Sequence, residues 1–306
     1  MIFDAHCDVL YKLYQYPSIN FQHSDDLHIT ATQLEKHGSK VQLFAIFLPP
    51  DLLPGARFQA ALKMIDLFYE KILKPNPNMK MVKSKAEIEQ LKADETGVML
   101  SLEGCEGIEG DLLKLKTLLR LGVASVGLTW NWANEVADGA MEPRGGGLTR
   151  FGKEVILTLN QHKIWTDVSH LSERAFWETI EIAQYPVASH SNSYTICPHP
   201  RNLRDDQAKA IFERKGCIGI TFVPFFTQKN GKAKINDVIQ HVEKMCELGG
   251  EDHIGFGSDF DGISETIIGL SSYKDYDKLI DELYRCYSST QVGKFLYDNF
   301  LRAIPS

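Results

Sequence analysis

The sequence predicts an α/β fold in which eight parallel strands alternate with helices and close into a (β/α)8 TIM barrel. Eight short apolar runs are spread along the 306 residues, and a segment with helical periodicity lies between most of them. Strands that alternate with helices are typical of βαβ units and a parallel sheet. The chain is long enough for this barrel, which needs roughly 250 residues. Because no linker or internal repeat divides the chain, we expect residues 1–306 to form a single domain.

The predicted strands are the apolar runs, taken in chain order. They cover residues 2–8, 41–49, 97–103, 125–131, 164–170, 187–191, 217–223 and 253–260. Helical periodicity follows most of them, and two further helical stretches follow the last strand and should complete the outer ring. The predicted helices cover residues 58–73, 112–121, 149–161, 172–184, 206–215, 236–248, 276–287 and 289–301.

Capping residues and one long connection complete this prediction. Thr149 and Ser172 each offer a side-chain oxygen to the free N–H groups of a first helical turn. The connection 9–40 is long and polar, and we interpret it as a helix followed by an excursion over the barrel. Its three histidines are predicted to be surface residues: His23, His28 and His37.

Composition excludes several classes of protein. Hydrophobic residues make up 43% of the chain and charged residues 24%, which is ordinary for a globular protein. The net charge of -7 provides no basic excess for nucleic acid, and no run of about 18 apolar residues predicts a membrane helix. The six cysteines show no CxxC spacing, and no leader or lipid-anchor signal is recognisable. We therefore expect a reduced, cytoplasmic enzyme with neither nucleic acid nor membrane as its partner.

Histidines and carboxylates gather where the predicted strands end. Barrel enzymes place their active sites at the C-terminal ends of the strands, so these side chains should meet at one mouth. Residues two apart on a strand share a face, so His6 and Asp8 should point the same way on the first strand. Asp259 and Asp261 should do so on the last strand. The set consists of His6, Asp8, Glu103, His170, His190, Asp259 and Asp261.

This set of residues predicts a metal centre. Such groups could be polar rim residues bonded to loops, but together they would repel or desolvate one another unless a cation neutralised them. Imidazole and carboxylate suit Zn²⁺, and five ligands exceed the three that one catalytic zinc usually takes. Glu103 could bridge two ions, with His6 and Asp8 on one and the pair His170 and His190 on the other. Two such metals can hold a hydroxide between them and polarise a carbonyl.

The motifs that contain these residues resemble those of the membrane (renal) dipeptidase family, which are metallopeptidases of the amidohydrolase-like barrels. The resemblance runs from the motif of residues 4–8 to that of residues 299–302. Each motif is short, but their order and spacing together are specific. The most specific are Leu102–Gly104, Leu128–Asn131, Asp167–His170, Ser189–Ser191, Arg201–Asn202 and Gly257–Gly262.

The resemblance implies roles for these residues. The family binds a pair of zinc ions, and its ligands correspond here to His6, Asp8, Glu103, His170 and His190. Arg201 corresponds to the arginine that grips the substrate carboxylate, and Asn202 lies beside it in the same motif. Asp259 corresponds to the residue that transfers a proton. Without the resemblance, a loop salt bridge from Arg201 to Asp205 or Asp206 is the alternative.

Two positions depart from the family pattern. Trp130 stands where renal members have a histidine that helps bind the substrate and stabilise the oxyanion. An indole donates one N–H but cannot take up a proton, so oxyanion stabilisation would rest more on the metal. Cys7 lies between His6 and Asp8 and alternates away from them, so we expect it to be packed.

We therefore predict a zinc-dependent dipeptidase that acts on small dipeptides through a metal-bridging hydroxide, with two Zn²⁺ per chain. A related metal-dependent amide hydrolase or deaminase is the alternative enzyme, and a requirement for a free α-amine would favour the dipeptidase. A non-catalytic metal-binding barrel is disfavoured because all five ligand positions are filled. A homodimer is left open.

Overall fold

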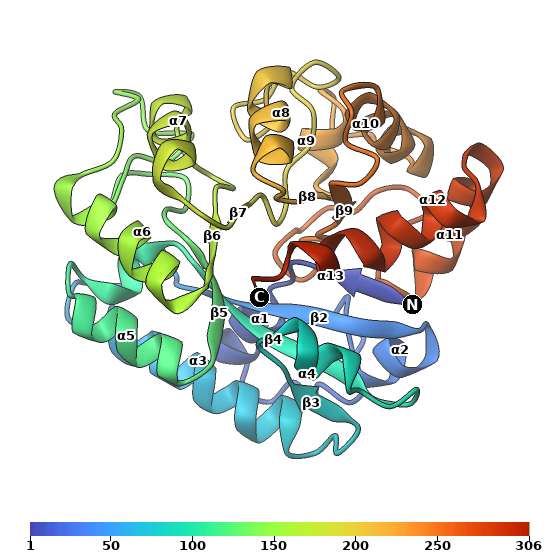
Figure 1. Ribbon diagram of the computed structural model, residues 1–306. Coiled ribbons are helices and arrows are strands. Elements are labelled where there is room, and N and C mark those ends of the chain that lie inside the picture. The colour runs from blue at the N-terminus through green and yellow to red at the C-terminus, as the bar shows by residue number, and fades with distance from the viewer. Residues whose placement is uncertain (306) are drawn as a thin grey trace.

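The computed structural model describes residues 1–305, and a parallel sheet that curves into a barrel forms its centre (Figure 1). The sheet order is β7-β6-β5-β4-β2-β1-β9-β8, and a parallel bridge from Ala188 to Ile218 joins its two edges. The predicted eight-stranded barrel is therefore confirmed. Its strands are β1 Ile2–Asp4, β2 Ser39–Phe47, β4 Thr96–Glu103, β5 Val123–Gly127, β6 Trp165–Asp167, β7 Pro186–Val187, β8 Ile218–Ile220 and β9 Ile254–Phe256.

Most strands are shorter than the apolar runs predicted. The run 2–8 leaves the ladder after Asp4, and the run 253–260 leaves it after Phe256. The residues beyond these points form the loops of the barrel mouth, where ladder pairing stops although the chain stays buried. The sequence also missed β3, Met79–Met81, which pairs with β4 outside the ring.

Helices lie around the sheet, and those from α5 to α8 follow one another around the ring in chain order (Figure 1). The N-caps predicted at Thr149 and Ser172 are confirmed: their side chains accept from Gly152 N and Ala175 N. The predicted helix 289–301 is instead three short pieces. No helix within residues 1–305 has both the length and the apolar character needed to cross a membrane. The α-helices are α1 Val9–Gln15, α2 Ala31–Lys36, α3 Arg57–Leu67, α4 Lys85–Glu89, α5 Leu112–Arg120, α6 Arg150–His162, α7 Glu173–Ile182, α8 Asp205–Glu213, α9 Pro224–Thr227, α10 Ile235–Glu247, α11 Tyr276–Cys286, α12 Ser289–Gly293 and α13 Asn299–Ala303. The shorter 3-10 and π turns are η1 Phe68–Leu73, η2 Cys105–Ile108, η3 Tyr273–Asp275 and η4 Lys294–Asp298.

The connection 9–40 holds α1, α2 and an excursion that packs back onto the barrel. His23 is exposed as predicted, but His28 is half-buried, and its Nδ1 accepts a hydrogen bond from Asp261 N at 3.0 Å. His37 is also half-buried and forms an ion pair with Asp277 at 2.8 Å. The surface prediction is therefore wrong for His28 and His37, because long-range contacts hold this excursion against the barrel.

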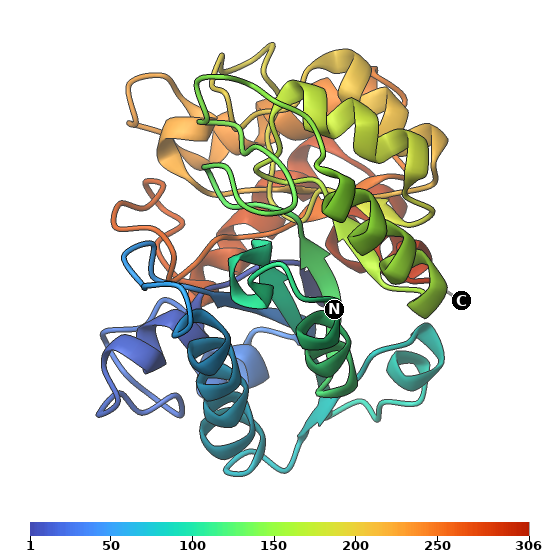
Figure 2. The ribbon, with the colours of Figure 1, turned by 90° about the vertical axis from the view of Figure 1, so that its left-hand side faces the viewer.

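The end of the barrel away from the active-site loops is sealed by the C-terminal segment. Phe3 in β1 stacks on Phe300 with ring centroids 5.2 Å apart, and Trp165 Nε1 donates to Ala303 O at 2.8 Å. Figure 1 shows α13 across the middle of the ring, and Figure 2 shows the long loops on the side opposite the C-terminus. With one end filled by apolar packing, the other end is left for polar side chains.

Candidate active site

The five predicted metal ligands converge at the barrel mouth, and each is at most 9% exposed. They come from the end of β4 and from the loops after β1, β6 and β7. His6 Nε2 lies 3.3 Å from Asp8 Oδ2 and 3.3 Å from Glu103 Oε2. On the other side, Glu103 Oε1 lies 3.0 Å from His170 Nε2 and 3.7 Å from His190 Nε2.

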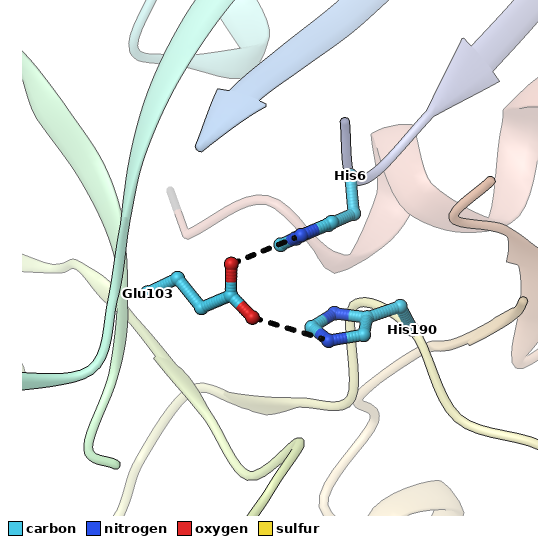
Figure 3. Close-up of side chains that lie close together, drawn as sticks. All are labelled: His6, Glu103 and His190. Carbon is cyan, nitrogen blue, oxygen red and sulfur yellow. Dashed lines mark ion pairs between the residues drawn. The ribbon is translucent and has the colours of Figure 1, made fainter. Parts of the chain in front are cut away.

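Glu103 lies between two groups of possible ligands. Figure 3 shows one carboxylate oxygen facing His6 and the other facing His190. Two overlapping sets have ligand atoms within 4.8 Å of one another: His6, Glu103 and His190, and His6, Asp8 and Asp259. The geometry is therefore compatible with a carboxylate shared between two cations, and it also brings Asp259 within reach of one of them.

The imidazoles of His170 and His190 are electrically neutral. Burial, with the charge of Arg201 added, lowers the pKa of His170 to about 3. Burial also lowers the pKa of His190 well below its ordinary value, and the neighbouring imidazoles reinforce the shift. Because a histidine binds metal only in its neutral form, both rings are in the state that metal binding requires.

The opposite side is crowded with carboxylates. Burial and the charge of Glu103 raise the pKa of Asp8, and the same two causes raise the pKa of Asp259. Burial opposes charging of His6, but the carboxylates of Glu103 and Asp8 outweigh it and raise its pKa well above the ordinary value. His6 Nε2 and Asp8 Oδ1 are buried without a hydrogen-bond partner. A divalent cation would satisfy both atoms and offset the repulsion, so these residues fit a metal.

Hydrogen bonds set the orientation of the two neutral imidazoles. The Ser189 hydroxyl donates to Asp167, so its oxygen is the acceptor for His190 Nδ1–H at 2.7 Å. His170 Nδ1 lies 2.9 Å from Asn131 Oδ1, which can only accept. Both Nε2 lone pairs are thereby directed toward Glu103, the usual arrangement of a metal-binding histidine.

Sequence reasoning missed these supporting residues, although all three lie inside the motifs it used. Asp167 Oδ1 also accepts from Ser169 N and Ser189 N, both at 3.0 Å. Its carboxylate therefore holds the ends of β6 and β7 together beneath the two histidines. The signal was available in the spacing, because Asp167 precedes His170 by three residues and Ser189 adjoins His190.

Asp259 and Asp261 do not share a face, contrary to prediction. Both have left-handed backbones, with φ of 63° and 70°. Asp259 Oδ1 lies 3.9 Å from His6 Nε2, whereas Asp261 turns away and accepts from His28 N and Ile29 N. The alternation ended because β9 stops at Phe256. Gly262 follows, where any Cβ would collide with the carboxylates of Asp8 and Asp259.

Arg201 is a buried cation without an ion pair. Its side chain is 3% exposed, Nη2 donates to His190 O at 3.3 Å, and Nε has no hydrogen-bond partner. Burial lowers its pKa to about 10, which leaves the guanidinium charged at neutral pH. The salt bridge to Asp205 is not formed, because that carboxylate pairs with Lys244 at 3.0 Å. Across residues 1–305, no carboxylate forms an ion pair with Arg201.

Asn202 and Cys7 have structural contacts. Asn202 Nδ2 donates to Cys197 O at 2.8 Å and to Phe226 O at 2.7 Å, which ties the Arg201 loop to α9. Its Oδ1 is buried without a partner. Cys7 is buried and its thiol donates to Leu43 O, as expected for a packed residue.

A cleft of about 590 Å³ opens directly above the ligands. Its walls include Trp130, whose ring centroid lies 5.2 Å from that of Phe47 and 6.4 Å from that of His170. Arg201 lines a neighbouring cavity of about 760 Å³, and His170 borders both spaces. The structure thus brings the predicted substrate residues Trp130 and Arg201 to two sides of His170.

Comparison with known proteins agrees with this arrangement. The family model described as membrane dipeptidase, peptidase family M19, matches residues 1–306. An uncharacterized protein in the pqqA 5′ region of Klebsiella pneumoniae is 32% identical over 82% of this chain and 97% of its own length. An uncharacterized dipeptidase of Schizosaccharomyces pombe is 28% identical over 98% of this chain and 79% of its own length.

Solved structures show the same fold. The metallopeptidase described as dipeptidase AC is 26% identical, with a TM-score of 0.92, and the alignment covers 99% of this chain and 97% of that one. A metallopeptidase of Rhodobacter sphaeroides, liganded with a phosphinate mimic of L-Ala-D-Ala, has a TM-score of 0.93 at 24% identity and covers 99% and 98%. The match over the whole chain shows that this protein belongs to the membrane dipeptidase family, peptidase family M19, and is a metallo-dipeptidase.

Proposed function

We propose that this protein is a zinc-dependent dipeptidase that binds two Zn²⁺ with Glu103 as the shared ligand. The observation that carries the proposal is the carboxylate of Glu103, whose two oxygens face different ligand groups 3.3 Å and 3.0 Å away. His6 and Asp8 would hold one ion, and His170 and His190 the other. Zinc bound there would supply an activated water nucleophile and polarise the scissile carbonyl.

Asp259 is the proposed proton carrier. Burial and the charge of Glu103 raise its pKa, so its carboxyl group can hold a proton more readily than an exposed aspartate. It borders the cleft beside His6 and can pass that proton to the leaving amine. Its place within a candidate ligand set also allows a direct role in metal binding, which metal analysis of a variant distinguishes.

Arg201 is the proposed clamp for the substrate C-terminus. A buried guanidinium without an ion pair is costly, and a carboxylate would satisfy it through paired N–H bonds. Asn202 supports this role by holding the loop, and we propose that Trp130 lines the pocket on the other side of His170. A carboxylate clamp at this place would limit the substrate to one residue beyond the scissile bond.

The alternative is a broader metal-dependent amide hydrolase or deaminase on the same barrel. It needs no free carboxylate on its substrate, so it gives no reason to bury an unpaired Arg201 beside the metal ligands. This single residue therefore favours the dipeptidase. The cytoplasmic location and the homodimer remain predictions.

The deciding experiment compares dipeptides with their C-terminal amides. The zinc-reconstituted protein should cut a panel of dipeptides and largely spare the amides. Arg201→Ala should cost roughly 2–5 kcal/mol in transition-state binding toward dipeptides and lose most of the preference for the free acid. Arg201→Lys is the matched control and should recover only part, because an ammonium lacks the planar fork. Equal cleavage of acids and amides by the wild type would support the amide hydrolase instead.

A further inference from the structure

We propose that a second chamber beside the metal cleft receives the side chain of the substrate's N-terminal residue and selects a cationic one. Glu106 is the recognition carboxylate, so dipeptides that begin with lysine or arginine are the preferred class. The inference rests on the proposed dipeptidase function and assigns a specificity to it.

The chamber opens from the metal cleft itself. It has a volume of about 900 Å³, and Phe47, Glu103 and Trp130 line both spaces. The two spaces therefore adjoin and share part of their walls.

The order of the strands places this chamber opposite Arg201. Phe47 ends β2, whereas Arg201 follows β7 and is bonded to His190 O. In the ring, three strands separate β2 from β7 in either direction. A dipeptide whose carboxylate is held by Arg201 and whose carbonyl lies over Glu103 must therefore extend its N-terminal residue toward β2. Phe47, Trp130 and the chamber lie on that side.

Within residues 1–305 the carboxylate of Glu106 forms no ion pair, although the charge of Arg57 acts on it from the wall of the same chamber. It accepts a hydrogen bond from Asn134 Nδ2 at 3.1 Å and a long one from Trp130 N at 3.5 Å, and no lysine or arginine of the described chain forms an ion pair with it. Gly104, with φ of +84°, gives it room, because any Cβ there would collide with Glu106 Oε2. A partly buried carboxylate without an ion pair is stabilised by a bound counter-charge.

The walls of the chamber also suit a cation. Phe47, Trp130 and Trp132 supply aromatic rings, and a cation over such a ring is attracted to its face. Besides the ligand Glu103, its charged residues are Glu106, Glu135 and Arg57, so carboxylates outnumber the one cation. Arg57 is held by a hydrogen bond from Nε to Leu52 O at 3.0 Å and forms no ion pair with Glu106. Arg57 would favour an acidic side chain of the substrate, whereas Glu106 would favour a cationic one. Substrates of the two charges therefore distinguish which residue is selective.

Three dipeptides with a common C-terminal alanine provide that test. Lysyl-alanine carries the cation, norleucyl-alanine has nearly the same length without charge, and glutamyl-alanine carries an anion. For the wild-type zinc enzyme we expect kcat/KM for lysyl-alanine to exceed that for norleucyl-alanine by about tenfold or more, the scale of one charge-assisted hydrogen bond. Glu106→Gln, which keeps the shape and the acceptor oxygen, should bring this ratio to about one.

Two controls separate Glu106 from its surroundings. Glu135→Gln removes a carboxylate at the exposed rim of the same chamber and should change the lysine-to-norleucine ratio by less than about twofold. Zinc content of Glu106→Gln should equal that of the wild type. A loss of zinc would show that Glu106 acts through the metal centre and would overturn the proposal.

The remaining outcomes are equally distinct. Equal loss of kcat/KM for lysyl- and norleucyl-alanine in Glu106→Gln would assign Glu106 to a group common to all dipeptides, such as the α-amine, and would overturn the proposal. A wild-type preference for glutamyl-alanine that disappears in Arg57→Gln would also overturn the proposal. It would identify Arg57 as the selective residue. If no dipeptide is cut, the dipeptidase function itself fails and this inference falls with it.

Discussion

The two sides of the Glu103 carboxylate differ in charge and in how they are supported. Toward β6 and β7 it faces His170 and His190, two neutral imidazoles whose Nδ1 atoms are held by Asn131 and Ser189. Toward β1 and β9 it faces His6, whose ring centroid lies 3.9 Å from that of His190 but whose Nε2 is also close to the carboxylates of Asp8 and Asp259. The first side offers oriented lone pairs, and the second offers negative charge.

The two proposed ion positions therefore depend on different interactions. On the imidazole side, affinity depends on ring orientation, which remote hydrogen bonds control. On the carboxylate side, a cation is attracted chiefly by charge that has been buried at a cost. Changes to the shared ligand should therefore affect both ions, whereas changes to the supports should affect one.

The largest effect is expected from Glu103→Gln, which removes the charge shared by both sides. A neutral amide cannot supply two anionic oxygens, so we expect loss of both ions and a fall in kcat/KM of roughly 10³-fold or more, in line with the several kcal/mol that metal catalysis supplies. Elemental analysis after zinc loading, with about two Zn²⁺ per wild-type chain as reference, measures the first effect. A variant that keeps two ions would contradict the shared-ligand assignment.

The next largest effect is expected from Asp259→Asn, on the carboxylate side. If Asp259 carries the proton, kcat should fall by about 10²-fold or more, while zinc content stays close to that of the wild type. Steady-state kinetics and metal analysis of the same preparation provide the measurement. Loss of one ion would instead make Asp259 a ligand and would add a fourth protein group to that side.

A smaller effect is expected from Ser189→Ala, on the imidazole side. The imidazole of His190 would lose the acceptor that fixes its Nδ1 proton, so affinity for one of the two ions should fall by roughly 10- to 100-fold. Competition with a zinc chelator should then show one weak and one nearly normal site. Equal weakening of both sites would contradict the prediction that a support of the imidazoles affects only one ion. Thr195→Ala is a control, because its hydroxyl bonds Asp205 away from the centre.

The last prediction concerns a buried imidazole remote from the centre and should leave activity near neutral pH unchanged. His241 in α10 accepts from Ser193 N and donates to Thr227 O, and burial lowers its pKa to about 4. The unfolded chain binds a proton at this residue below about pH 6.5, whereas the folded chain does so only near pH 4. Stability from neutral His241 is therefore complete above pH 6.5 and lost as pH falls toward 4, by about 3 kcal/mol.

Urea unfolding at pH 7 and pH 4.5 measures this effect. Other buried carboxyl groups also titrate in that range, so His241→Gln is the necessary comparison: its free energy of unfolding should depend less on pH than that of the wild type. Identical pH dependence in both proteins would mean that His241 contributes nothing to acid sensitivity.

The sequence by itself determined the barrel and the members of its metal centre. Apolar runs alternating with helical segments specify βαβ units, because each run must be buried and each helix must cover it. Strand ends of a parallel barrel meet at one mouth, so His6, Glu103, His170 and His190 could be assembled from their positions alone. The position of Asp259 at the mouth also followed from its predicted strand, but its role and that of Arg201 required the family resemblance.

Tertiary contacts set the points where strand pairing stops and the conformations of the loops that follow. The residues His170, Asp259 and Asp261 have positive φ, which ends the strand alternation that had placed the two aspartates on one face. Asp261 instead bonds the backbone of residues 28 and 29, more than 230 positions away. The hydrogen bond from Ser189 to Asp167 likewise connects the ends of β7 and β6. The chamber at Glu106 is lined by residues from separate strands. Local patterns cannot predict such contacts, because loop conformation follows from partners that only the closed barrel brings together.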